Sequence, residues 1–298
     1  FSWVTGMPVL VALVFGALIS PTDPVAVLGV LREAALRKSL ETKIAGESLF
    51  NDGVGYVVFL VLLGLAFPAA GHGSAAPDLS HAGVLFLQEA GGGVLLGAAL
   101  GWLVFRIMQR IDDYALEVLI TLALAMGGYA LAQRLHVSAP LMAVFAGLFI
   151  GDVGMRHAMS EETRHYVEAF WKLVDEILNA VLFLMIGFEV FAVHFGADTL
   201  VAGAAAIALS LAGRLAAVVV PIALLRPFRK FSPGIVPIMT WGGLKGGISV
   251  ALALSLPEGE WKPTILAATY VVVVFSILVQ GLTVGRVANR FGRAPDLL

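Results

Sequence analysis

Long apolar stretches separated by short polar turns fill this sequence of 298 residues. A helix that crosses a bilayer needs about 20 consecutive apolar residues, and at that length the pattern predicts about nine segments. They cover residues 8–31, 42–67, 82–108, 114–135, 139–153, 171–193, 199–225, 234–256 and 263–287. The pattern therefore predicts an all-α polytopic membrane protein, in which 156–172 forms a connection with a short surface helix.

The composition supports the same class. Hydrophobic residues make up 59% of the chain and charged residues 13%, with a mean hydropathy of +0.92, which is too apolar for a protein with a solvated polar surface. The absence of cysteine excludes disulfides and thiolate metal sites. A net charge of -2 gives no reason to expect a nucleic-acid partner, so the expected surroundings are a lipid bilayer. Because the chain begins at Phe1 and enters an apolar run at once, we expect a fragment of a longer membrane domain.

Basic residues set the orientation, because cytoplasmic loops of membrane proteins hold an excess of Lys and Arg. All but four of the 19 Lys and Arg residues fall on one side of the predicted segments. These are Arg32, Arg37, Lys38, Lys43, Arg106, Arg110, Arg156, Arg164, Lys172, Arg226, Arg229, Lys230, Arg286, Arg290 and Arg293. The sequence thus predicts a multi-pass protein of the plasma (inner) membrane with a cytoplasmic carboxyl end.

Two of the apolar segments are interrupted. Ser20-Pro21-Thr22-Asp23-Pro24 breaks the first, because each proline lacks an N–H and clashes with the preceding turn. Trp241-Gly242-Gly243-Leu244-Lys245-Gly246-Gly247 weakens the eighth with four glycines. The two segments cross in opposite directions, as an inverted repeat requires. Such a pair indicates the binding site of a secondary transporter. Close helix packing is the alternative for the glycines, and an N-cap of the second half-helix is the alternative for Asp23.

Polar residues of the second segment share one helix face. Glu47 and Asn51 are i,i+4 neighbours, and so are Ser48 and Asp52. At 1.5 Å per residue from Lys43, Asp52 lies roughly 14 Å into a hydrocarbon core about 30 Å thick. Ionisable groups at such depth are expensive and mark functional sites.

Two cations lie at similar depth. Arg214 and Lys245 are each roughly 16 Å from the nearer end of their segment. Together with Asp23, Glu47 and Asp52 they leave one negative charge in excess if all five are ionised. A buried pair such as Glu47 with Arg214 leaves one carboxylate that either a proton or a monovalent cation can neutralise.

Four motifs, in order and on the right segments, resemble the sodium/proton exchanger family of monovalent cation/proton antiporters, most closely its bacterial NhaP-like members. They are Thr22-Asp23-Pro24, Gly46-Glu47-Ser48-Leu49-Phe50-Asn51-Asp52, Phe170-Trp171 with Leu178-Asn179-Ala180-Val181-Leu182-Phe183, and Trp241-Gly242-Gly243-Leu244-Lys245-Gly246. The resemblance implies part of a 13-helix antiporter fold with two inverted repeats. It also implies a homodimer. Residues 1–298 would form one membrane transporter domain, with core elements 8–67 and 199–288, a linker helix 82–108 and dimerisation helices 114–193.

The resemblance also implies roles for individual residues. Asp52 resembles the carboxylate that carries a proton or Na⁺ in turn, and Asp23, the Ser48 hydroxyl and the Thr22 carbonyl resemble the other cation ligands. Asn51 matches exchangers that move one proton per cation. Four further residues are expected to stabilise the core around this site: Glu47 and Arg214, as an ion pair, together with Asn51 and Lys245. Lys245 departs from many relatives, which have Arg.

These observations predict a secondary active antiporter that exchanges Na⁺ or another monovalent cation for H⁺, electroneutrally and without a cofactor. A monovalent cation channel or an ion sensor using the same carboxylates is the alternative, although channels need an open multi-site path. An intramembrane hydrolase is disfavoured because the sequence lacks His-Glu-x-x-His and Gly-x-Ser-x-Gly motifs.

Overall fold

Every regular element in the described part of the chain is a helix, which confirms the predicted class. The computed structural model describes residues 1–23, 38–67, 79–189, 196–229, 231 and 234–291. Its helices are α1 (Ser2–Thr5), α2 (Val9–Leu18), α4 (Lys38–Ala66), α5 (Leu79–Met108), α6 (Tyr114–Arg134), α7 (Ala139–Leu148), α8 (Met155–His157), α9 (Glu161–Glu189), α10 (Ala197–Leu225), α11 (Ile235–Trp241), α12 (Gly247–Leu254), α13 (Lys262–Phe275) and α14 (Leu282–Phe291), with π-helical turns η2 (Phe149–Gly154) and η4 (Ser276–Gly281).

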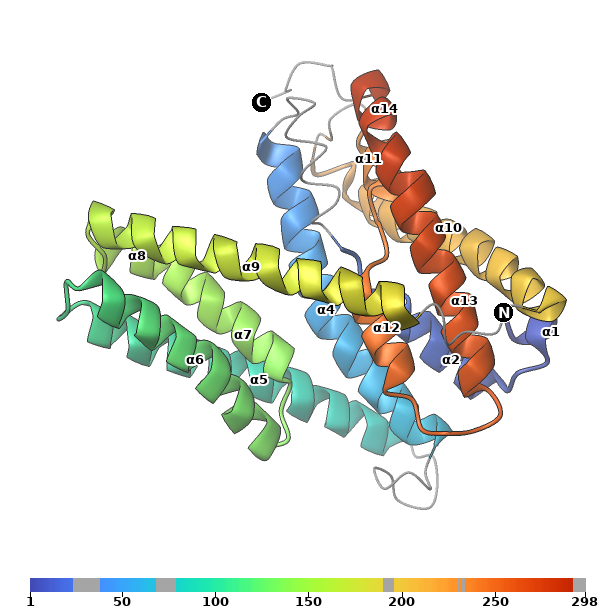
Figure 1. The fold of residues 1–298 in the computed structure, drawn as a ribbon, viewed down its shortest axis with the longest axis horizontal. Coiled ribbons are helices and arrows are strands. Elements are labelled where there is room, and N and C mark those ends of the chain that lie inside the picture. The colour runs from blue at the N-terminus through green and yellow to red at the C-terminus, as the bar shows by residue number, and fades with distance from the viewer. Residues whose placement is uncertain (24–37, 68–78, 190–195, 230, 232–233, 292–298) are drawn as a thin grey trace. The chain divides into compact units, whose positions relative to one another are not determined.

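Contacts divide the chain into two compact units. Unit one comprises Phe1–Gly55, Leu62–His72 and Ile186–Leu298, and unit two comprises Tyr56–Val61 and Gly73–Met185. Within unit one, α13, η4 and α14 form one continuous helix (Figure 1). Within unit two, α5, α6, α7 and α9 carry most of the structure.

Five helical stretches in the described residues are long and apolar enough to cross a membrane: Thr42–Ala66, Gly83–Met108, Tyr114–Arg134, Thr199–Leu225 and Lys262–Phe291. The helices Val9–Leu18 and Ala139–Gly151 are apolar but shorter. These spans agree with the predicted segments, while the total of nine stays a prediction. The second half of the interrupted first segment falls in 24–37, outside the described residues.

The expected separation of a surface helix from the sixth segment is wrong. A single helix, α9, runs from Glu161 to Glu189 through the charged stretch. An i,i+4 ion pair between Arg164 and Glu168, 2.9 Å apart, lies on its exposed face and favours helix there. Charge at the surface of a helix is compatible with its continuation, so polarity alone placed the boundary incorrectly.

In unit two, a stripe of glycines brings α5 close to α7. A methyl group at Gly93 would lie 2.6 Å from the Ser138 carbonyl oxygen, and one at Gly101 would lie 2.9 Å from the Phe149 Cβ. Gly97, between them, faces the Met142 backbone. Glycines four residues apart allow helix backbones to approach closely in membranes. This spacing explains why α5 and α7 pack side by side.

We therefore expect Gly97→Ala to destabilise unit two. The added methyl would overlap the Met142 carbonyl, so α5 and α7 must separate, at a cost of about 1–3 kcal/mol. Gly91→Ala is the matched control, because Gly91 lies on the same helix with no atom within 4 Å of the position of a Cβ. Thermal unfolding of the purified protein in detergent measures both. Equal midpoints for the two variants would contradict the packing role of Gly97.

Unit one has its own hydrophobic cluster, which surrounds the second interruption. Leu244, within the interruption, is 1% exposed and packs with Ile44 of α4, Ile238 of α11 and Val284 of α14. Burying a side chain of this size contributes about 1.5–3 kcal/mol. The apolar cluster thus fixes a non-helical segment of backbone between three helices.

Candidate functional site

The site of interest is in unit one, where the two predicted interruptions lie against each other. The first follows α2, which ends at Leu18. The carbonyl oxygens that end a helix have no partners within it and form its negative pole. Here the Lys245 ammonium donates to the Ser20 carbonyl at 2.9 Å and to the Pro21 carbonyl at 3.4 Å, and the Asn51 amide donates to Ser20 at 2.9 Å. A buried cation therefore stabilises the end of the half-helix.

The second interruption separates α11, which ends at Trp241, from α12, which begins at Gly247. Backbone groups that a break releases must find partners when buried. Side chains from two other helices supply them. Arg214 donates to the Met239 carbonyl, Gln280 donates to the Trp241 carbonyl at 3.1 Å, and the Ser276 hydroxyl accepts from the Lys245 amide at 2.7 Å.

The two interruptions also bond to each other. The Asp23 amide donates to the Leu244 carbonyl at 2.8 Å. A methyl group at Gly246 would lie 2.5 Å from the Asp23 Oδ2, so only glycine admits the carboxylate there. Gly246 precedes the first residue of α12, whose amino-terminal end carries a partial positive charge. Each half-helix end thus has a charge of opposite sign beside it: Lys245 at α2 and Asp23 at α12.

Oxygen atoms gather where α4 passes the first interruption. The Ser48 and Thr22 hydroxyls lie 3.0 Å apart, and each of these residues is 3% exposed. The Asp52 carboxylate accepts a hydrogen bond from the Thr22 backbone, and its Oδ1 is buried without a hydrogen-bond partner among the described residues. Asp23 and Lys245 are the charged groups that act on it. Oxygen ligands of this kind suit a hard cation or a proton.

Glu47 turns from this group toward α10. Its carboxylate forms a bidentate ion pair with Arg214, in which Arg214 Nη2 lies 2.8 Å from Glu47 Oε2. Arg214 also donates to the Met239 carbonyl through Nε at 3.1 Å and Nη2 at 2.9 Å. Gly243 packs directly against the guanidinium, leaving no room for a side chain. Arg214 therefore joins α4, α10 and α11.

The structure thus brings together Asp52, Ser48, Thr22 and Asp23, pairs Glu47 with Arg214, and places Asn51 and Lys245 on the carbonyls of the first interruption. Sequence reasoning missed two things. The first is that the Lys245 ammonium donates its hydrogen bonds to backbone carbonyls. The second is that Ser276 lies next to the site, where it bonds to the Lys245 amide. The spacing of Ser276 and Gln280, four residues apart in an apolar segment, was the available signal.

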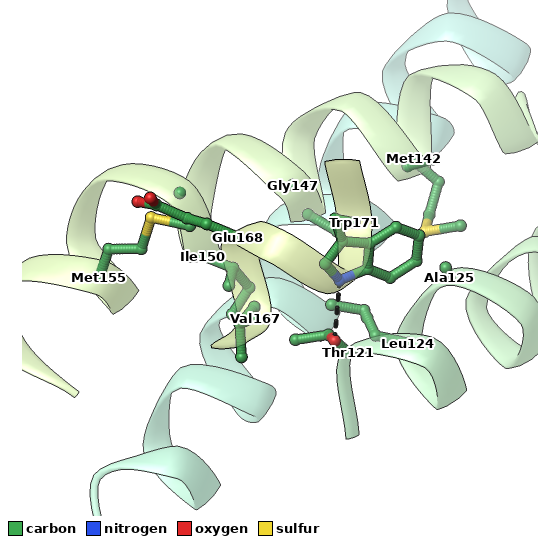
Figure 2. A pocket seen from close by; sticks show the side chains of 13 residues that line it. Thr121, Leu124, Ala125, Met142, Gly147, Ile150, Met155, Val167, Glu168 and Trp171 are labelled. Atoms are coloured by element: carbon green, nitrogen blue, oxygen red, sulfur yellow. Dashed lines mark hydrogen bonds between the residues drawn. The ribbon is translucent and has the colours of Figure 1, made fainter. Parts of the chain in front are cut away.

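Unit two contains a cavity of about 350 Å³, lined mostly by apolar residues of α6, α7, η2, α8 and α9 (Figure 2). At one wall the Trp171 indole donates to the Thr121 hydroxyl at 2.9 Å. One turn from Thr121, Glu117 is fully buried and interacts with Thr163, whereas Asp113 caps α6. Glu117 lies near the end of a membrane segment, where a carboxylate commonly serves as a boundary cap, but that role belongs to Asp113 here. The cavity offers few polar groups, so it is a poor candidate for ion binding.

Two helix interruptions that lie against each other with buried charges, among described helices long and apolar enough to cross a membrane, are typical of an integral membrane protein of the transporter class. The family comparison agrees. The family described as "Sodium/hydrogen exchanger, transmembrane" matches residues 1–290, and the chain belongs to this family. The family is one of transporters.

Individual relatives support this placement. The chain is 52% identical over 282 residues to the Na(+)/H(+) antiporter NhaP of Pseudomonas aeruginosa, with 93% of this chain and 65% of the relative covered. It is 36% identical over 295 residues to the Na(+)/H(+) antiporter NhaH of Halobacillus aidingensis, with 97% and 70% covered. The chain thus spans about two thirds of the length of these relatives.

The fold is similar to that of the solved sodium proton antiporter MjNhaP1 from Methanocaldococcus jannaschii. The TM-score is 0.71 at 19% identity, and the match covers 98% of this chain and 74% of that chain. This similarity confirms the antiporter fold expected from the motifs, while the number of helices and the inverted repeats stay predictions.

Proposed function

We propose that the protein containing this chain is a secondary active antiporter that exchanges Na⁺, or another monovalent cation, for H⁺ across the membrane. The observation that carries the proposal is the group of oxygen atoms at Asp52, Ser48 and Thr22, placed beside two interrupted helices. Buried carboxylates at interrupted helices are typical of ion sites in secondary transporters. The relatives named as Na(+)/H(+) antiporters support the same activity.

In this mechanism a single carboxylate serves both ions. Deprotonated Asp52 takes the dehydrated cation, with further oxygen ligands from Ser48, Thr22 and Asp23. Because Asp52 Oδ1 lacks a partner among the described residues, it is the atom we assign to the cation or the proton. The hydroxyls of Ser48 and Thr22, now bonded to each other at 3.0 Å, can turn their lone pairs to the cation. Proton and cation exclude each other at one carboxylate, which couples the two fluxes.

The remaining charges fit an electroneutral exchange. Glu47 is occupied by Arg214, and the Lys245 ammonium is held by the carbonyls of Ser20 and Pro21. Position 51 is Asn, and its amide bonds to the Ser20 carbonyl, so it offers no second carrier carboxylate. We assign the exchanged proton to Asp52 alone, which gives one proton for each monovalent cation.

The domain organisation is part of the proposal. The core elements 8–67 and 199–288 would move as a body against dimerisation helices 114–193, with 82–108 as the linker helix, so that the site faces each side in turn. The division into two compact units supports this, since unit one holds the site and unit two holds α5, α6, α7 and α9. We further propose a homodimer in the plasma (inner) membrane with a cytoplasmic carboxyl end.

The test is cation-dependent proton flux in vesicles that contain the full-length protein and an internal pH dye. Na⁺, K⁺ and Li⁺ are added in turn while the membrane potential is clamped at several values. We expect flux that saturates with the cation, requires a counter-gradient and does not vary with the potential. A non-saturating cation current would support a channel, and cation binding without flux would support an ion sensor; either result would overturn the proposal.

A further inference from the structure

The last helix of unit one contains a π-helical turn beside the second interruption. The regular helix α13 ends at Phe275, the turn η4 covers Ser276–Gly281, and α14 follows directly (Figure 1). Such a turn inserts one residue into the helix, is less stable than a regular turn, and often occurs at functional sites. Gly281 within it lies beside Leu244, whose side chain would be in ordinary van der Waals contact, at 3.4 Å, with a methyl group there.

Two side chains of this turn bond to backbone at the two ends of the interruption. Ser276, which is fully buried, accepts from the Lys245 amide at 2.7 Å. Gln280, which is 3% exposed, donates to the Trp241 carbonyl at 3.1 Å. Thr283, one turn further on, accepts from the Trp241 indole at 2.8 Å. These contacts lie on either side of residues 242–244, at Trp241 and at Lys245. They fix both ends of the non-helical backbone to the helix formed by α13, η4 and α14.

The backbone held in this way carries groups of the proposed ion site. Lys245 uses its amide to reach Ser276 and its ammonium to reach the Ser20 and Pro21 carbonyls. The neighbouring Leu244 carbonyl accepts from the Asp23 amide at 2.8 Å. A shift of this peptide would therefore move the cationic partner of the first interruption and the backbone of Asp23 together.

We propose that Ser276 and Gln280 are positioning residues, which hold the 242–246 segment in the geometry that sets the affinity of the site for its cation. This rests on the proposed antiport function. Neither side chain contacts Asp52, Ser48 or Thr22 in any described hydrogen bond, so each acts through Lys245 and Leu244. The register of a single helix thus controls the geometry of the ion site.

The experiment compares Ser276→Ala and Gln280→Leu in the full-length protein with a matched control. Thr269→Val is that control, because Thr269 lies on the same helix, is fully buried, and donates only to the Ile265 carbonyl of its own helix at 2.7 Å. Na⁺-dependent proton flux in vesicles gives the apparent KM and the maximal rate. Ser276→Ala and Gln280→Leu are expected to raise the apparent KM for Na⁺ by about fivefold or more, while Thr269→Val stays within about twofold. Ser276→Thr, which keeps the hydroxyl, should restore the wild-type KM.

A second readout does not depend on transport. Hydrogen exchange of the peptide containing 242–249 should become faster in Ser276→Ala and Gln280→Leu and stay unchanged in Thr269→Val. Unchanged exchange in both variants overturns the inference, as does a KM that moves no more than in the control. If wild-type protein shows no Na⁺-dependent flux, the proposed function fails, and the exchange measurement still decides whether the two residues hold the segment.

Discussion

Replacing Asp52 by Asn is expected to abolish cation-dependent proton flux, lowering it to less than about one hundredth of the wild-type rate. The amide keeps the size of the carboxylate and can still bond to Thr22, but it carries no charge and cannot release a proton at neutral pH. Both halves of the exchange use this one group, so both are lost. The measurement is the rate of internal pH change in vesicles after Na⁺ is added.

Stability separates this loss from misfolding. A carboxylate whose Oδ1 is buried without a hydrogen-bond partner among the described residues is unfavourable, so Asp52→Asn should leave the thermal midpoint equal to that of the wild type or higher. Asp112→Asn is the control, because Asp112 is an exposed carboxylate before α6 and its substitution should leave flux within about twofold. Flux above about one tenth of the wild-type rate in Asp52→Asn would show that another group carries the proton.

The position of the interruptions could be predicted because it depends on local chemistry. Proline removes a backbone donor and glycine weakens a helix, whatever surrounds them. Helix α11 ends at Trp241 and α12 begins at Gly247, as the glycines indicate. The grouping of Ser48 with Asp52 was equally local, since residues four apart share a helix face.

Partners of the buried charges could not be predicted with the same success, because backbone carbonyls leave no signature in a sequence. A count of charged side chains uses Lys245 only to offset the negative charge of the carboxylates. In the structure its ammonium donates to the backbone carbonyls of Ser20 and Pro21. The π-helical turn at Ser276–Gly281 is similar. Its side chains bond to α11 and to the interruption, and periodicity within its own segment does not reveal these partners.

Helix ends near charged residues were the other source of error. Glu117 lies close to the start of α6, a position that in sequence suggests a solvated boundary, but it is fully buried while Asp113 caps the helix. Polarity measures how a residue interacts with water, not how neighbouring helices cover it. The burial of Glu117 depends on packing between helices, which a single-segment pattern does not contain. The extent of α9 agrees instead with a local i,i+4 ion pair, which a search for apolar stretches overlooks.

Removing Arg214 is expected to destabilise the protein more than removing its partner Glu47. Arg214→Gln breaks the bidentate pair, leaves the Glu47 carboxylate without its cation, and deprives the Met239 carbonyl of two donors. Breaking a buried pair in this way costs about 3–5 kcal/mol. Glu47→Gln leaves Arg214 still bonded to Met239, so its expected cost is smaller, about 1–3 kcal/mol. Unfolding in mixed micelles of increasing SDS content gives the free energy of unfolding of each variant.

The double variant and a charge exchange separate the pair from the role of Arg214 on Met239. The double variant Glu47→Gln/Arg214→Gln should be more stable than Arg214→Gln alone, because Glu47→Gln removes the carboxylate that Arg214→Gln leaves unpaired, and less stable than the wild type, because the Met239 carbonyl still lacks its donors. Exchanging the charges with Glu47→Arg and Arg214→Glu should not restore stability, since a carboxylate at position 214 cannot donate to the Met239 carbonyl. Arg229→Gln, at an exposed position of unit one, should change the free energy of unfolding by less than about 0.5 kcal/mol. If the charge exchange restored the full free energy of unfolding, Arg214 would stabilise the site through Glu47 alone. The Met239 carbonyl of α11 would then need no hydrogen bond from a side chain.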